Sequence, residues 1–486
     1  MPELEARHLV RSTQHMLDDL NDFSAHSLRL KLVDYLSHDG GGNDSTFNEA
    51  LLSEEAAAVI VKLLPRENLT VSRAELDADD ETRLDVFYPQ RQIPLPSPPL
   101  STVIAEKLQA LFVEEKGTIA HILSSSYVAT GPNNVNGRPM GGSAFSPQLK
   151  EDISRRMRRS LGYAETYHLA FSLFTPESQP SSWDVEAASQ EALGPLLEAF
   201  ASISKFTVDT QVQIYAESSP TAPPPEYDES QAAWMLKEED LSAFINAAEW
   251  PLSPSIGAGP TISFILYVPS PSQHPLFVSE DRASSWIIPQ WGGVVLLNPP
   301  LVNSTSAADN GAYQLSNPAH LSQEDLRSAF SIFSHQLLAL LGMPATPTSL
   351  RLRLQALTRI HVASLLLSAS TTMGSLARLT ESLPSIPIPA TVAASVSTTL
   401  SHLSSACRLL HQGRFTAALA SARVAEAEAE RSFFEKSMVG QVYFPDEHKV
   451  AVYLPLLGPI GVPLIVGLLK ELKRWVNNFK AKRQRI

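Results

Sequence analysis

Cysteine and histidine are the residue types in this chain best suited to nucleophilic chemistry. The chain has one cysteine, Cys407, and 13 histidines. A reactive thiolate needs an accessible, electropositive position beside a base such as histidine. Cys407 lies in the segment SHLSSACRLL, where it shares a predicted helical stripe with Leu403 and Leu410. This spacing predicts a buried, unreactive thiol, and a single cysteine excludes an intrachain disulfide and a multi-thiolate metal site.

Other chemical motifs are weak or missing. The chain contains no HExxH, GxSxG or GxxxxGKS/T motif, and the glycine-rich loop at 137–142 lacks the lysine of a phosphate cradle. The segment PQWGGV at 289–294 could form a ligand-binding turn, although such a glycine pair more often starts a strand beside a bulky residue, here Trp291. Glu426, Glu428 and Glu430 are spread around a predicted helix and indicate a solvated face. We expect no cofactor and no catalytic residue.

A long apolar segment near the C-terminus is the most distinctive structural element that the sequence predicts. Residues 450–469 are twenty residues without a charge, and as a helix they span ~30 Å, the thickness of a bilayer's hydrocarbon core. One acid, Glu471, follows this segment, against seven basic residues: Lys470, Lys473, Arg474, Lys480, Lys482, Arg483 and Arg485. Positive charge marks the cytosolic side of a span. We predict a transmembrane helix at 446–470, a basic cytosolic tail at 471–486 and a luminal bulk; a proline-rich core segment of a soluble protein is the alternative.

Three prolines and two glycines give the predicted span a distinctive packing pattern. We expect Pro455 in the first turn, where its missing N–H costs little, and kinks at Pro459 and Pro463. Gly458 and Gly461 would let a neighbouring helix approach closely.

The charge pattern raises a question of topology. A chain with only a C-terminal span would insert as a tail anchor, with its bulk in the cytosol, and this orientation opposes the charge rule. We therefore expect an N-terminal span that this chain lacks. The glycosylation sequons at Asn43, Asn68 and Asn303 permit a luminal bulk but do not demonstrate it.

Upstream of the span, the pattern of apolar residues predicts an α/β fold. The 486 residues are 44% apolar and carry a net charge of −13, which suits two or three packing units and argues against nucleic-acid binding. We expect a helical part over 1–100, with helices at 28–36 and 53–64, then a mixed β-sheet core flanked by helices over 101–324, and a helical segment over 325–445. The core strands are predicted at 118–129, 167–174, 208–216, 261–268 and 292–298, with a helix at 183–206 that completes a βαβ unit.

Several separated stretches resemble one known family. SLGYAETYHLAFSLF, TISFILYVPSPSQHPLFV, IIPQWGGVVLLN and YFPDEHKVAVYLPLLGPIGVPLIVGLLKELKRW occur in the order found in the PIG-S family. The resemblance runs from about Asp18 to the C-terminus. It implies a subunit of the glycosylphosphatidylinositol (GPI) transamidase in the endoplasmic reticulum membrane, with one span at each end of a large luminal domain.

The resemblance also implies a division of labour within that complex. The transamidation belongs to a PIG-K subunit, which resembles a cysteine peptidase, and the other expected partners are PIG-T, PIG-U and the GPAA subunit. PIG-S is implied to be an accessory subunit, so no catalytic residue is carried over to this chain. Two other functions stay open: a tail-anchored cytosolic adaptor, and a luminal hydrolase with an unrecognised site.

Overall fold

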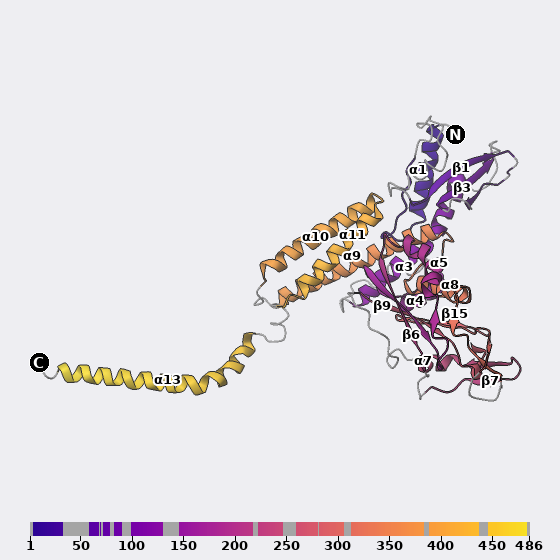
Figure 1. Cartoon of the computed structure of the whole chain (residues 1–486). Coiled ribbons are helices and arrows are strands. Elements are labelled where there is room, and N and C mark those ends of the chain that lie inside the picture. The colour runs from indigo at the N-terminus through magenta and orange to yellow at the C-terminus, as the bar shows by residue number, and fades with distance from the viewer. Residues whose placement is uncertain are drawn as a thin grey trace. The chain divides into compact units, whose positions relative to one another are not determined.

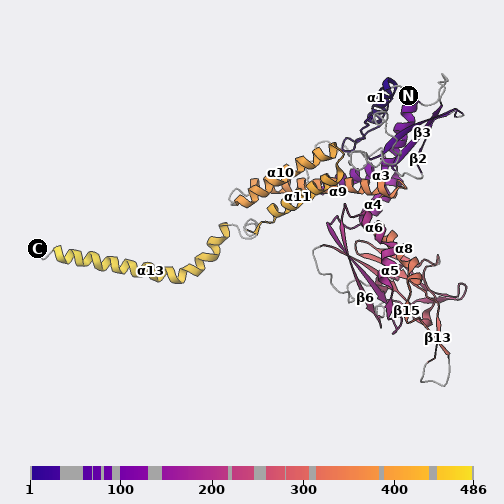
Figure 2. The same cartoon turned by 45° about the horizontal axis from the view of Figure 1, so that its top comes forward.

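The computed structural model describes residues 3–32, 58–67, 69, 71–77, 82–89, 99–129, 145–216, 222–245, 259–279, 281–305, 313–382, 388–436 and 446–483. The chain forms two compact units, whose elements are labelled in Figures 1 and 2. Unit 1 comprises Met1–Ser364 and Arg408–Leu419, and unit 2 comprises Leu365–Cys407 and Ala420–Ile486.

The N-terminal part of unit 1 contains a three-stranded sheet with the order β1-β3-β2. The central strand β3 pairs in parallel with β1 and antiparallel with β2. Its Leu84 and Val86 are fully buried in a core shared with helices α1 and α3. The bounds are α1 Glu3–Asp19, β1 Ile60–Arg66, β2 Arg73–Leu76, β3 Arg83–Pro89 and α3 Leu100–Ala129.

This sheet corrects the prediction of an all-helical N-terminal part. The helix predicted at 53–64 is a strand from Ile60 onward, because β-branched side chains and the pairing with β3 outweigh the upstream Ser-Glu helix signal. In the helix predicted at 28–36, residues 28–32 have no helical structure, and the rest lies outside the described residues.

Helix α3 corrects a second prediction, the strand at 118–129. All of this segment belongs to the 30-residue helix. The buried residues Ile104, Leu108, Leu111, Phe112 and Ile119 recur at helical spacing and cover the sheet and neighbouring helices. The end of this segment is rich in β-branched residues and serine, but it remains helical because the preceding residues of α3 are packed in the N-terminal core.

A five-stranded sheet with the order β11-β12-β9-β4-β6 forms the main core of unit 1. β12, β9, β4 and β6 are parallel, and β11 is an antiparallel edge strand. β4 and β9 are almost entirely buried, as expected for central strands of a parallel sheet. The bounds are β4 Thr166–Phe174, β6 Lys205–Gln213, β9 Thr261–Tyr267, β11 Ser285–Ile288 and β12 Gly292–Leu296, so the predicted strands here are confirmed.

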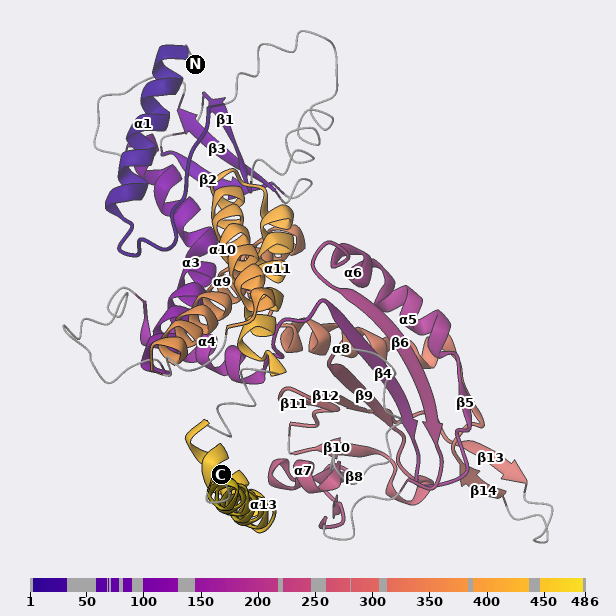
Figure 3. The ribbon, with the colours of Figure 1, turned by 90° about the vertical axis from the view of Figure 1, so that its left-hand side faces the viewer.

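Helices cover one face of this sheet (Figure 3). Phe171 of β4 and Phe264 of β9 pack against Phe330 and Phe333, which project from α8. The predicted βαβ unit is confirmed, but its single helix at 183–206 is two short helices that meet at Leu193, just before Pro195. The bounds are α4 Pro147–Arg159, α5 Val185–Ala192, α6 Gly194–Ala199 and α8 Gln323–Leu340.

A smaller sheet with the order β10-β8-β7 packs on the opposite side of strands β9 and β12. Its Leu236, Leu276 and Val278 join Ile265 and Val294 in one buried cluster. The remaining elements of unit 1 are short: β5 Ser182–Trp183, β7 Glu226–Asp228, β8 Ala233–Leu236, η2 Glu238–Asp240, α7 Leu241–Phe244, η3 Pro271–Gln273, β10 Leu276–Val278, β13 Val302–Thr305, β14 Tyr313–Ser316 and β15 His320–Leu321.

The C-terminal region is helical, as predicted. Within unit 2, Ala369 packs with Ala425 and Ala429, and Leu376 packs with Val392. Small side chains at these positions allow the helices to approach closely. The bounds are α9 Leu350–Ser382, α10 Ala390–His411, α11 Phe415–Phe433 and α13 Asp446–Arg483.

Cys407 is exposed, so the prediction of a buried thiol is wrong. The neighbouring Ala406 is fully buried in its place, while Leu403 and Leu410 are half-buried. One residue corresponds to about 100° around a helix, and this rotation takes Cys407 off the packed face of α10.

Candidate functional site

Helix α13 displays a large apolar surface. It runs from Asp446 to Arg483 with the three prolines inside it. Leu454, Leu457, Ile460, Leu464 and Leu468 are each between 63% and 69% exposed. These five positions lie on one side of the helix, and Val462, Val466 and Leu469, which are also exposed, lie on another, so apolar side chains cover more than one side of it. Such a surface requires a membrane or protein partners to cover it.

The helix boundaries revise two details of the predicted span. Pro455 is the tenth residue of α13, so it lies in the helix interior and not in the first turn. The helix also continues without interruption through Lys470 to Arg483, so that most of the predicted basic tail is helical. The ribbon of α13 bends along its length (Figure 1), as expected when prolines remove backbone donors. Space beside Gly458 and Gly461 is open within the chain.

Within the described residues, one helix satisfies the length and hydropathy of a membrane span. This helix is α9, with a mean hydropathy of 1.3 over its most apolar window. However, α9 also carries Arg359, which forms a buried ion pair in unit 1, and Ala369, which is fully buried in unit 2. At these positions α9 packs against other parts of the chain.

The predicted glycosylation positions are only partly described. Asn303 lies in β13, which pairs antiparallel with β14. Asn43 and Asn68 lie outside the described residues. The glycine loop at 137–142 also lies outside them.

The PQWGGV segment forms the turn between β11 and β12. Gln290 adopts a positive φ of 58°, and the two glycines begin β12. A side chain on Gly292 would collide with the backbone of Ser263 in β9, and one on Gly293 would collide with the amide of Gln336 in α8. The glycine pair thus starts the strand, which is the second of the two roles considered for it, and it also permits close packing against β9 and α8.

Buried charges on α3 form a group that the sequence reasoning missed. Glu114 accepts hydrogen bonds from the backbone N–H groups of Ala345 (3.1 Å) and Thr346 (2.7 Å) and forms an ion pair with Arg156. Burial acts to raise the pKa of Glu114, but the charge of Arg156 and the hydrogen bonds outweigh it and lower that pKa.

Glu115 occupies a similar environment on the next face of α3. Arg359 of α9 donates two hydrogen bonds of 2.7 Å to its carboxylate, and His26 lies 3.4 Å away. Burial opposes the charged form, but Arg359 and His26 overcome it and lower the pKa of Glu115 to about 2. The signal that could have located both residues is a charged Glu-Glu-Lys triplet inside an otherwise apolar helical segment.

These charges are arranged for structure. Each carboxylate is fully engaged by arginine and hydrogen-bond donors, and so neither is poised as a general base near neutral pH. In the described part of the chain, no cluster of three or more histidine, cysteine, aspartate or glutamate side chains could hold a metal ion. The predicted glutamates of α11 are also engaged: Glu428 interacts with Ser395 and Arg431, and burial raises the pKa of Glu426.

Comparisons with known proteins give a consistent result. A family model described as PIG-S, phosphatidylinositol-glycan biosynthesis class S protein, matches residues 1–478. The chain is 31% identical over 364 residues to the GPI transamidase component PIG-S homolog of Schizosaccharomyces pombe, a match that covers 70% of the chain and 62% of the relative. It is 29% identical over 350 residues to the GPI-anchor transamidase component PIGS of Homo sapiens, covering 68% and 61%. The chain thus spans about three fifths of the length of these curated relatives.

Proposed function

The chain belongs to the PIG-S family, and we propose that it is a non-catalytic membrane subunit of a GPI transamidase complex. The names of its relatives support this assignment, since each is called a component of the GPI transamidase. In this proposal, the complex attaches a preassembled GPI anchor to the C-terminus of proproteins in the endoplasmic reticulum.

The single observation that carries the membrane part of the proposal is the exposed apolar surface of α13. Its twenty uncharged residues from Val450 to Leu469 match the thickness of a bilayer core. Both the bilayer and partner helices would cover the side chains that the chain itself leaves exposed. In this arrangement, the basic residues after Leu469 lie in the cytosol, and unit 1 together with the part of unit 2 before α13 lies in the lumen.

The proposed role of the folded part is to hold other subunits in place. The buried ion pairs of Glu114 and Glu115 join α3, α4, α9 and the segment after α8 into one rigid support. We assign the transamidation to a PIG-K-like cysteine peptidase and place PIG-T, PIG-U and the GPAA subunit as the other neighbours. The proline-containing helix α13 docks between partner helices in the membrane.

A pull-down tests this proposal directly. The tagged full-length protein is purified in mild detergent from its own cells, and the co-purifying proteins are identified by mass spectrometry. Recovery of the cysteine-peptidase-like subunit together with other transamidase subunits is the expected result. A tagged, unrelated endoplasmic reticulum protein of similar abundance serves as the control. If the protein is stable in the membrane but is recovered alone, the proposed function is rejected.

The two rival functions give different results. A cytosolic adaptor would carry no N-linked glycan, because the cytosol lacks that modification. A luminal hydrolase would show activity when purified alone, and its loss would leave GPI attachment unchanged. Under the proposed function, loss of this protein lowers the amount of GPI-anchored protein at the cell surface.

A further inference from the structure

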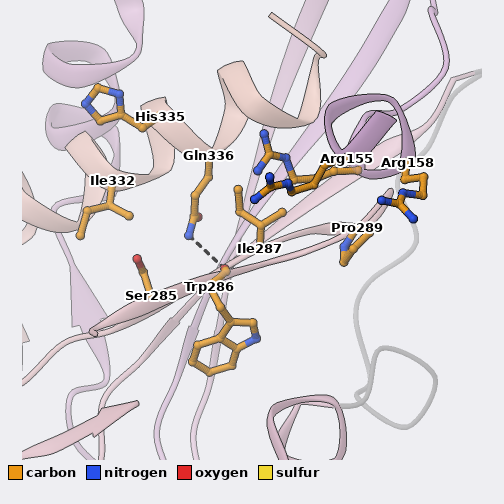
Figure 4. Close-up of a pocket in the computed structure, with 10 residues that line it drawn as sticks. Arg155, Arg158, Ser285, Trp286, Ile287, Pro289, Ile332, His335 and Gln336 are labelled. Carbon is orange, nitrogen blue, oxygen red and sulfur yellow. Dashed lines mark hydrogen bonds between the residues drawn. The ribbon is translucent and has the colours of Figure 1, made fainter. Parts of the chain in front are cut away.

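A basic hollow lies in unit 1 between helix α4, strand β11 and helix α8 (Figure 4). Its volume is about 720 Å³, which is within the usual size range of small-molecule sites. None of its lining residues is acidic: they are Arg155, Arg158, Arg159, Ser285, Trp286, Ile287, Pro289, Ile332, His335 and Gln336. This composition favours an anionic ligand.

Three arginines on α4 supply the charge of the hollow. Arg155 stands three and four residues before Arg158 and Arg159, so that all three share one side of the helix. Arg155 interacts with Asp152 at 2.9 Å, and Arg158 interacts with Glu151 at 3.2 Å. Both pairs are on the surface, where an ion pair contributes little and is readily exchanged for another partner.

Arg159 is the least compensated of the three. Its Nε atom is buried and has no hydrogen-bond partner in the described part of the chain. Burial, followed by repulsion from Arg156 and Arg155, lowers the pKa of its guanidinium, which nevertheless remains charged at neutral pH. An anion in the hollow would relieve this repulsion.

The backbone of α4 is held in place before any ligand binds. Ser146 caps the start of α4 by accepting a hydrogen bond from the backbone N–H of Leu149. At the other end of α4, the backbone N–H of Gln290 donates to the carbonyl of Arg159 at 3.0 Å, which joins the helix to the turn after β11. The fixed helix presents all three arginines from set backbone positions, and this reduces the entropy lost on binding.

The other walls of the hollow are largely apolar. Ile287 and Pro289 form the strand side, and Ile332 projects from α8. Gln336 is occupied elsewhere, because its amide N–H group donates to the carbonyl of Trp286 at 3.0 Å. The indole of Trp286 points away from Gln336, to the opposite side of the strand (Figure 4). The hollow thus combines a positively charged wall with apolar surface.

From this arrangement we propose that the hollow binds a phosphate ester, with the phosphate on the α4 arginines and the organic group on Ile287, Pro289 and Ile332. Planar guanidinium groups match the oxygens of phosphate in paired hydrogen bonds. Three arginines suit a doubly charged phosphate better than a single carboxylate, and the apolar walls would be unused by inorganic phosphate alone. This inference does not depend on the proposed function, because it uses only residues of this chain.

Titration of the detergent-solubilised full chain tests the inference. Isothermal calorimetry and the thermal midpoint follow binding of inorganic phosphate, glycerol 3-phosphate and dioctanoyl phosphatidic acid, with dioctanoyl phosphatidylcholine as the zwitterionic comparison. We expect saturable binding of a phosphate monoester, stronger than that of inorganic phosphate, and at least a roughly tenfold loss of affinity in Arg159→Gln. Arg159→Lys, which keeps the charge but loses the paired geometry, should retain an intermediate affinity.

Two further variants distinguish a loss of binding from a loss of folding. Arg158→Gln alters an exposed side chain, so it should leave the thermal midpoint without ligand unchanged and still weaken binding. Arg327→Gln, an exposed arginine of α8 that pairs with Glu191 outside the hollow, should change nothing. Binding of phosphatidic acid but not of glycerol 3-phosphate would support the site and identify a lipid headgroup as the source. The inference is overturned if no phosphate compound binds, if Arg327→Gln weakens binding equally, or if dioctanoyl phosphatidylcholine binds as tightly as phosphatidic acid.

Discussion

At the scale of single residues, the most informative positions are two adjacent buried glutamates. Glu115 is 2% exposed and Glu114 is 6% exposed, yet both are held in the charged form by arginines from other elements. Burying a charge is costly, and removing one partner of a buried pair leaves the other uncompensated. The two carboxylates therefore make the packing of α3 depend on the correct placement of α4 and α9.

The charge of Glu115 makes stability depend on pH. Its carboxyl pKa is about 2 in the folded protein, against an ordinary value of 4.5. A lowered pKa means that the stabilisation is fully present above pH 4.5 and is lost as the pH falls toward 2. The difference corresponds to on the order of 3 kcal/mol. We expect Glu115→Gln to lower the free energy of unfolding at pH 7 by about 3–5 kcal/mol and to make that free energy less sensitive to pH between 4.5 and 2.

Urea unfolding of the detergent-solubilised chain at several pH values measures both effects. Glu3→Gln is the matched control, because Glu3 forms an exposed pair with Arg7 and should change stability little. An equal pH dependence in wild type and Glu115→Gln would contradict the assignment of a charged, buried carboxylate.

The sequence predicted the structure of single residues correctly where neighbouring residues in the chain determine it. The glycine pair after Trp291 was predicted to start a strand beside that bulky residue, and it does start β12. The close approach of Gly292 to Ser263 and of Gly293 to Gln336 was not predicted. Cys407 and Glu115 could not be placed in this way. The exposure of Cys407 depends on which neighbouring residue fills the packed face of α10. The environment of Glu115 depends on Arg359, which lies 244 residues away in the chain.

At the scale of elements, α13 is unusual because three prolines lie inside a continuous helix. A proline in a helix interior destabilises it by roughly 3 kcal/mol. Replacing Pro459 and Pro463 by leucine should therefore stabilise the helix itself and keep the segment apolar. If the variant recovers fewer partner subunits, the cause is therefore the changed shape of the helix and not a failure of the helix to fold.

We expect the double variant Pro459→Leu/Pro463→Leu to be expressed normally but to recover less of the other transamidase subunits in a mild-detergent pull-down. The physical reason is that a straighter helix fits less well between partner helices, which need the kink and the open space beside Gly458 and Gly461. Quantitative mass spectrometry of the purified material measures the change. Leu464→Ile, which preserves the prolines and the apolar volume, is the control, and unchanged recovery in the proline variant would reject the docking role.

The elements also show why some predictions from the sequence hold and others fail. β4, β9 and β12 were located correctly because a strand buried on both faces reads as a short, nearly continuous apolar run. The end of α3 was taken for a strand, since Thr118 to Ala129 is rich in β-branched residues and serine. Its helical state is set by the residues before it, whose contacts with the N-terminal sheet are long-range and are not visible in a local window.

At the scale of the whole molecule, the charge distribution and the apolar helix constrain the membrane orientation. The chain has a net charge of −13, yet the residues after Leu469 are strongly basic. The charge rule counts lysine and arginine near the ends of a span, so it favours a basic tail on the cytosolic side. The sequence predicts this orientation, although the α/β fold alone would fit either compartment.

Protease protection of intact microsomes tests the orientation for the whole chain. The protein is expressed from its own gene with an epitope tag after Ile486. In a parallel version, a second epitope, the hairpin epitope, replaces residues 306–312 between the paired strands β13 and β14. With the bulk luminal and the tail cytosolic, added protease should remove the C-terminal tag while the hairpin epitope survives, because the membrane shields it. Detergent should then expose both epitopes to the protease, and this sample is the control for accessibility. Digestion of the hairpin epitope in intact vesicles, together with survival of the C-terminal tag, would establish the opposite orientation, which only a tail-anchored cytosolic protein would have.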